Sequence, residues 1–135
     1  MTTPADASTF EQVAALVRAT QALPADRVIR PEQLLFYDLA FSSMDMLDLL
    51  FRIEDHFGVA IAEGTLYRLA RADLPDAAFA DAGTLTPLGR ERLMALLSDS
   101  PAAIFPERIA TDGLPRFATV GAIGRLIDHL RAQGR

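Results

Sequence analysis

The sequence of 135 residues contains no cysteine, and this absence removes several classes of protein at once. Without thiols there is no disulfide framework, no thiolate metal site and no cysteine nucleophile. A chain without disulfides is compatible with the reducing cytoplasm, which is the location we expect.

Lysine is also absent, and positive charge is in short supply. All 13 basic residues are arginine, against 18 acidic residues, so the formal net charge is −5. Nucleic-acid binding requires a basic surface, so we expect no nucleic-acid partner. The exclusive use of arginine, together with abundant alanine, suggests a GC-rich bacterial genome.

Long apolar runs are missing as well. A helix that crosses a bilayer needs about 18 or more apolar residues, and no run in this chain approaches that length. The opening stretch MTTPADASTFEQ has neither the basic start nor the apolar segment of a secretory signal. We therefore expect no membrane insertion.

The chain does have enough apolar material for a folded core, because half of its residues are hydrophobic. Its length is ordinary for one domain, and apolar residues recur at helical spacing without strong strand alternation. We predict a monomeric, single-domain, all-α protein over residues 1–135. Capping and stop signals place its helices at about residues 9–23, 43–57, 65–72, 86–97 and 119–133.

The helix expected over residues 43–57 should separate an apolar face from an acidic one. Between residues 38 and 58 there are five acidic residues and one basic residue, so nearly all the excess negative charge of the chain lies here. Gly58 is a natural residue to end this helix. Its predicted apolar face consists of Met44, Leu47, Leu50, Phe51 and Phe57.

Conventional catalysis finds little support in the sequence. The two histidines, His56 and His129, are distant in sequence from the serine pair described below, and no G-x-S-x-G elbow surrounds those serines. The acids beside His56 are its immediate neighbours on a helix, and such neighbours do not share a face. We therefore predict no catalytic residues and no metal site.

Two adjacent serines, Ser42 and Ser43, precede the acidic helix. We place Ser43 at the cap position, where its hydroxyl would stabilise the helix by about 1 kcal/mol. The surrounding stretch DLAFSSMDML also closely resembles the D-L-G-x-D-S-L-x-x-V/L pattern of acyl carrier proteins. RPEQLLFYDL before it, LDLLFRIEDHFGVAI after it and FATVGAIGRLIDHL near the end resemble three further landmarks of that family. The resemblance covers roughly residues 8–62 and 117–132.

This resemblance implies a fold, a cofactor and a set of partners. It implies a carrier-type helical bundle in which Ser43 receives 4′-phosphopantetheine from coenzyme A, added by a phosphopantetheinyl transferase. The thiol of the arm would then hold acyl groups as thioesters for fatty-acid, lipid or polyketide biosynthesis. Acyl-loading and acyl-processing enzymes with basic docking surfaces would be the other partners, because the acidic helix suits them. The docking residues implied are Met44, Asp45, Leu47, Asp48 and Glu54.

Three departures from the family pattern bear on this hypothesis. Ser42 stands where an aspartate usually precedes the modified serine, and it is a competing acceptor for the arm. Ala40 replaces the usual glycine. The third departure is a long insertion at about residues 62–118, before the last helix.

The insertion is too rich in apolar residues for a flexible linker, so we expect it to fold against the bundle. Its role is open between thickening the core, shaping a pocket for an unusual acyl chain and presenting a partner surface.

Three alternatives to an acyl carrier remain at this point. One is a peptidyl carrier of non-ribosomal synthesis, although the G-G-x-S sequence usual there is missing. The second is a carrier-like interaction module that is never modified. The third is a hydrolase that uses Ser43.

Overall fold

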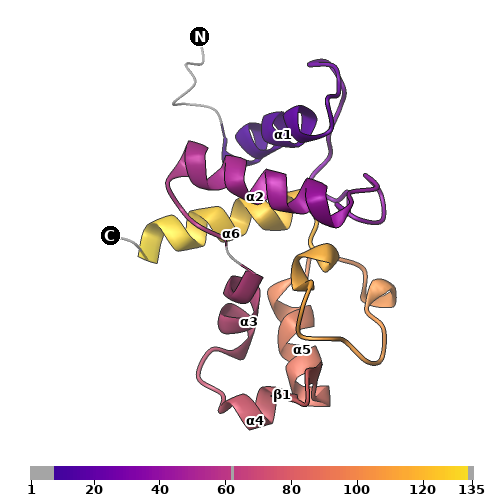
Figure 1. The fold of residues 1–135 in the computed structure, drawn as a ribbon, viewed down its shortest axis with the longest axis vertical. Helices are drawn as coiled ribbons and strands as arrows, with labels where there is room; N and C mark the ends of the chain where they lie inside the picture. The colour runs from indigo at the N-terminus through magenta and orange to yellow at the C-terminus, as the bar shows by residue number, and fades with distance from the viewer. Residues whose placement is uncertain (1–7, 62, 134–135) are drawn as a thin grey trace.

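The computed structural model describes residues 8–61 and 63–133, which form two groups of helices stacked on each other (Figure 1). In the first group, α1 packs against both α2 and α6, so the last helix of the chain lies beside the first. This arrangement is the helical bundle predicted from the sequence. The group consists of α1 (Thr9–Thr20), α2 (Ser43–Phe57) and α6 (Val120–Gln133).

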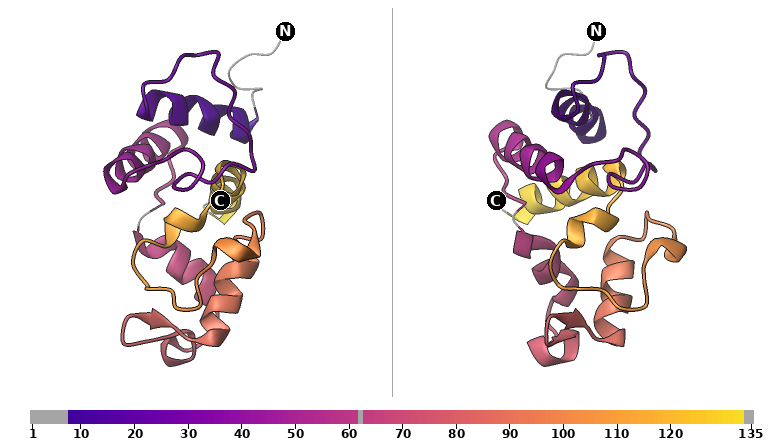
Figure 2. Two further views of the ribbon diagram at one scale, coloured as in Figure 1. Left: turned by 90° about the vertical axis from the view of Figure 1, so that its right-hand side faces the viewer. Right: turned by 45° about the vertical axis from the view of Figure 1, so that its right-hand side comes forward.

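The second group is built by residues 63–117 and lies against one side of the first group in each of the views (Figures 1 and 2). Within it, α3 packs against both α5 and the 3₁₀ turn η3, and α4 packs against α5. Its helices and turns are α3 (Glu63–Arg71), α4 (Asp76–Phe79), α5 (Pro87–Leu96), η2 (Ala102–Ile104) and η3 (Leu114–Phe117).

A small antiparallel hairpin in the second group was not predicted. Its strands β1 (Ala80–Asp81) and β2 (Thr84–Leu85) pair in the register Ala80↔Leu85 and Asp81↔Thr84. Two residues per strand are too few to show the alternation by which strands are recognised in a sequence. The fold is otherwise helical, as predicted.

Local capping chemistry explains where most helices begin and end. Ser8, Thr86 and Thr119 each accept a hydrogen bond from the backbone N–H three residues further on. These bonds satisfy N–H groups that have no partner within the helix. Gly58 ends α2 with φ of 75°, a left-handed conformation that glycine adopts without strain. The helix α1 ends at Thr20, before residue 23 where we had predicted its end.

Buried side chains from both groups belong to one hydrophobic cluster. The segment 62–118 is therefore folded against the bundle, as its apolar composition predicted. Its largest fully buried side chains are Leu66, Phe79, Leu93, Leu97, Ile109, Leu114 and Phe117.

Helix α2 buries a different face from the one predicted. Its fully buried positions are Met46, Leu49 and Ile53. Three residues predicted for the core are instead exposed, namely Met44 (73%), Leu47 (48%) and Phe51 (62%). Both sets recur at helical spacing, so periodicity alone could not tell which of the two stripes faces the core.

The long loop between α1 and α2 is fixed to the start of α6. The N–H of Val120 donates to the carbonyl of Gln33, and the N–H of Gly121 donates to the carbonyl of Pro31, both at 2.9 Å. A Cβ on Gly121 would lie 3.0 Å from the Cβ of Pro31, so glycine permits this close approach. The loop that leads to the serine pair is thereby held in place.

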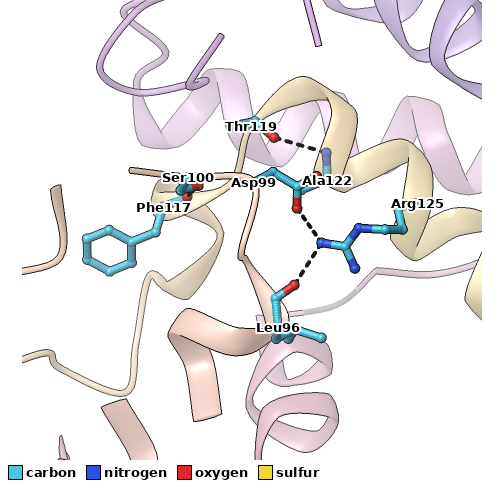
Figure 3. A network of polar contacts seen from close by, with 7 residues as sticks. All are labelled: Leu96, Asp99, Ser100, Phe117, Thr119, Ala122 and Arg125. Atoms are coloured by element: carbon cyan, nitrogen blue, oxygen red, sulfur yellow. Dashed lines mark hydrogen bonds and ion pairs between the residues drawn. The ribbon is translucent and has the colours of Figure 1, made fainter. Parts of the chain in front are cut away.

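A second set of polar contacts ties α6 to the end of α5 (Figure 3). The Arg125 guanidinium donates to the Leu96 carbonyl at 2.7 Å and forms an ion pair with Asp99. The buried Ser100 hydroxyl donates to the carbonyl of Phe117, at the end of η3. These contacts position η3 relative to both groups of helices.

Gly89 provides a test of the packing in the second group. A Cβ at this position would lie 2.0 Å from the carbonyl oxygen of Phe79, a backbone atom that cannot move alone. We expect Gly89→Ala to lower the free energy of unfolding by about 1–3 kcal/mol or more, as overpacked sites do. The measurement is equilibrium denaturation in urea.

The control is Gly64→Ala in α3, where a Cβ would meet nothing within 4 Å. This change should raise stability by roughly 0.5–1 kcal/mol, the helix-propensity difference. Similar effects of the two substitutions would contradict the packing described for α4 and α5.

Candidate functional site

The two serines at the start of α2 have different structural roles. The Ser42 hydroxyl accepts a hydrogen bond from the N–H of Asp45 at 3.1 Å, and the Asp45 carboxylate accepts one from the N–H of Ser42 at 3.0 Å. This reciprocal pair is a capping box, with Ser42 as the N-cap. The prediction that Ser43 caps the helix is therefore wrong, and Ser43 is the first residue of the helix.

The reason lies three residues downstream of each serine. Residue 45 is an aspartate, whose carboxylate can reach back to the N–H of Ser42. The corresponding residue for Ser43 is Met46, which has no acceptor to offer and is buried in the core. The capping box therefore selects Ser42.

The Ser43 hydroxyl is left available. Its side chain is exposed, and among the residues that the structure describes no hydrogen bond engages it. Ser43 also lines a pocket of about 490 Å³. An exposed hydroxyl with no structural duty, beside a cavity, is a suitable point for covalent attachment.

The pocket beside Ser43 has mainly apolar walls. They come from the loop before α2, from α2 itself, from the segment after it and from the approach to η3. Apolar side chains that line it include Phe36, Met46, Leu50, Phe51, Ile61 and Pro115. Such a cavity favours an apolar ligand, because the ligand would leave water without losing hydrogen bonds.

Part of the pocket wall comes from the segment 62–118. Gly113, Pro115 and Arg116 line the pocket, across from residues of α2. The segment therefore contributes directly to the surroundings of Ser43.

The acidic residues proposed for docking have unequal surroundings. Asp45 is half-buried and occupied in the capping box. Asp48 forms an ion pair with Arg52 at 2.8 Å, one turn further along α2. Glu54 is exposed and lies at the pocket. Of the three carboxylates, Glu54 is therefore the one with neither a capping bond nor an ion pair among the described residues.

An apolar stripe runs along the same exposed side of α2. Met44, Leu47 and Phe51 are exposed and all three line the pocket. Phe51, predicted for the core, was therefore missed as a surface residue. Its spacing of four from Leu47 and seven from Met44 was the signal that could have placed it with them.

The histidines and acids do not form a catalytic or metal-binding arrangement in the described parts of the chain. The His56 ring lies 2.8 Å from the side-chain oxygen of Gln12 in α1, and its edge packs against Phe57. Within residues 8–61 and 63–133 there is no group of three or more potential metal ligands. No helix there is long and apolar enough to span a bilayer.

Comparison with known proteins identifies one family. The model of the phosphopantetheine attachment site family matches residues 11–73, a little under half of the chain. The match includes α1 from Glu11, the loop, all of α2 and the whole of α3. It does not extend to residues 117–132, so the similarity of the last helix to that of acyl carriers remains a resemblance. Neither a curated protein nor a solved structure shows significant similarity to this chain.

The two serines can be separated by their effect on stability. Ser42→Ala removes the cap and should lower the free energy of unfolding by about 1 kcal/mol, within the usual range of 0.5–2. Ser43→Ala removes a hydroxyl without a hydrogen-bond partner in the described structure, so its effect should be within about 0.5 kcal/mol of zero. Thermal or urea denaturation of the two variants decides the matter, and a larger loss for Ser43→Ala would contradict the capping box.

Proposed function

We propose that residues 11–73, a phosphopantetheine-attachment carrier domain, bear their arm on Ser43 and that the protein thereby carries acyl intermediates. Domains of this family are carriers and not catalysts, they hold 4′-phosphopantetheine covalently, and phosphopantetheinyl transferases modify them. The observation that supports Ser43 most directly is the division of labour at α2, since Ser42 is the cap and the Ser43 hydroxyl is available. A cytoplasmic, monomeric protein is part of this proposal.

The attachment is a transfer of a phosphoryl-linked group to an alcohol. The Ser43 oxygen attacks the phosphorus next to the pantetheine in the pyrophosphate of coenzyme A, forming the new P–O bond of a phosphodiester. The P–O bond to the second phosphate breaks, adenosine 3′,5′-bisphosphate leaves, and the hydroxyl proton passes to a base of the transferase. Once attached, the arm supplies a thiol that can hold an acyl group as a thioester.

The pocket favours acyl cargo over aminoacyl or peptidyl cargo. Its apolar side chains could take up methylene groups, each worth about 0.8 kcal/mol when buried. An amino group placed among them would lose water without gaining a partner, which is costly. Specialised fatty-acid, lipid or polyketide-type biosynthesis is therefore the pathway class that we propose, ahead of non-ribosomal peptide synthesis.

We also propose that the segment 62–118 helps to shape this pocket. Gly113 and Pro115 line it, and the Ser100 bond to the Phe117 carbonyl fixes the turn that follows them. A role in cargo selection would account for a segment that the carrier family usually lacks, and it gives that segment more than a thickening of the core.

The proposed docking surface for partner enzymes is the exposed side of α2. Its centre would be the apolar residues Met44 and Leu47, joined by Phe51, which the sequence had not indicated. Asp48 and Glu54 would form the acidic rim that steers basic partners, while Asp45 is mainly committed to the cap. Apolar centres with charged rims are the usual anatomy of protein interfaces.

The attachment site can be tested by intact-mass measurement after treatment with a transferase and coenzyme A. The wild type and Ser42→Ala should each gain the mass of one phosphopantetheine group, whereas Ser43→Ala should gain none. Circular dichroism would first confirm that all three proteins are folded.

Each departure from that result has a defined meaning. A gain of mass by Ser43→Ala would show that the assignment is wrong. A wild type that never gains mass would identify an unmodified interaction module instead. Turnover of simple esters, lost in Ser43→Ala, would identify a hydrolase.

Steering by the acidic rim can be tested through its dependence on salt. Replacing Asp48 with Asn and Glu54 with Gln should slow modification by the transferase several-fold at low ionic strength, and less as salt rises and screens the charges. The matched control is Asp81→Asn with Glu91→Gln, which removes the same charge from exposed positions in the second group. Equal rates for the two double variants at low salt would rule out steering by this surface.

A further inference from the structure

Arg116 is a cationic side chain at the same pocket as Ser43. It lies within η3, in the segment 62–118, and lines the pocket together with Gly113 and Pro115. The guanidinium rests close to Gly113, where a Cβ added to the glycine would come within 3.6 Å of the Arg116 Cζ atom. The turn therefore brings one positive charge to a wall that is otherwise mainly apolar.

The guanidinium of Arg116 is poorly satisfied. Its Nε is sheltered from solvent and has no hydrogen-bond partner. One Nη contacts the carbonyl of Asp112 at 3.4 Å, which is long for a hydrogen bond from nitrogen to oxygen. The Cζ atom lies 5.2 Å from the centre of the Phe117 ring, so an aromatic face supports the charge but accepts no proton from the Nε.

Other arginines of the described chain show what Arg116 lacks. Arg52 and Arg125 each form an ion pair with a carboxylate, whereas Arg116 forms none among the described residues. Glu54 is the other ionisable side chain at the pocket, and it is not paired with Arg116. A buried donor without an acceptor is unfavourable, so a group that binds here and offers an anionic oxygen would relieve that cost.

We infer that Arg116 binds an anionic oxygen group of the arm carried on Ser43. Two parts of the loaded arm could supply that group: the phosphodiester next to the Ser43 oxygen, or a carboxylate at the far end of the cargo. The Nε–H and one Nη–H of a guanidinium form a planar fork that can hold two oxygens of either group at once. The apolar wall would strengthen the interaction, because it keeps water away from the charges.

This inference rests on the proposed function, since the ligand is the arm on Ser43. It adds a residue outside the matched carrier segment that would hold the arm against the pocket. Arg116 would thus be a positioning residue for cargo, supplied by the segment 62–118.

The direct test observes the Arg116 Nε–H signal by nuclear magnetic resonance in ¹⁵N-labelled protein. Four samples are compared: the unmodified protein, the protein with the arm alone, and the protein loaded with a monocarboxylic acyl group or with a dicarboxylic group of equal length. A shift and slower solvent exchange on adding the arm alone would identify the phosphodiester. A change with the dicarboxylic group only would identify the cargo carboxylate.

Intact mass is measured on the same samples, so the two proposals can fail separately. A protein that gains no mass overturns the attachment proposal, and this inference with it. Mass gained with an unchanged Arg116 signal in all loaded samples overturns this inference alone.

A variant provides an independent measurement. Attachment of the identified ligand form should raise the thermal midpoint of the wild type by roughly 3 °C more than that of Arg116→Gln. Arg108→Gln, an exposed arginine of the same segment, is the matched control and should behave like the wild type. Arg116→Lys keeps the charge without the fork and covers the case in which the glutamine variant does not fold. Equal gains in the wild type and in both Arg116 variants would overturn the inference.

Discussion

The reciprocal hydrogen bonds between Ser42 and Asp45 are the constraint on which the site depends. They determine the first residue of α2 and therefore the direction in which every later side chain of that helix points. With this start, Met46, Leu49 and Ile53 face the core and Met44, Leu47 and Phe51 face outward. The same bonds occupy the hydroxyl of Ser42 and leave that of Ser43 at the mouth of the pocket.

The sequence predicted the features that depend on neighbouring residues. Helix ends at Gly58, Thr86 and Thr119 follow from capping chemistry within a few positions, and the structure has them there. The identity of the N-cap of α2 depended on the residue three positions downstream, and examining Asp45 in that role would have favoured Ser42.

Features that depend on distant contacts could not be read in this way. Two apolar stripes on α2 were equally periodic, and only the packing of α1 and the second group shows which one is buried. The placement of Arg116 beside Ser43 depends on a turn fixed by Ser100 and by the start of α6, far along the chain. No local pattern around either residue indicates that they share a pocket.

The cap of α2 also changes the meaning of the serine that replaces the family's aspartate. Serine and aspartate are about equally good N-caps, so this exchange leaves the backbone at the attachment point unaltered. What it removes is a single negative charge immediately before Ser43. A transferase would therefore meet a familiar shape with a weaker electrostatic signature, so the exchange tunes selectivity among modifying enzymes at no cost in fold stability.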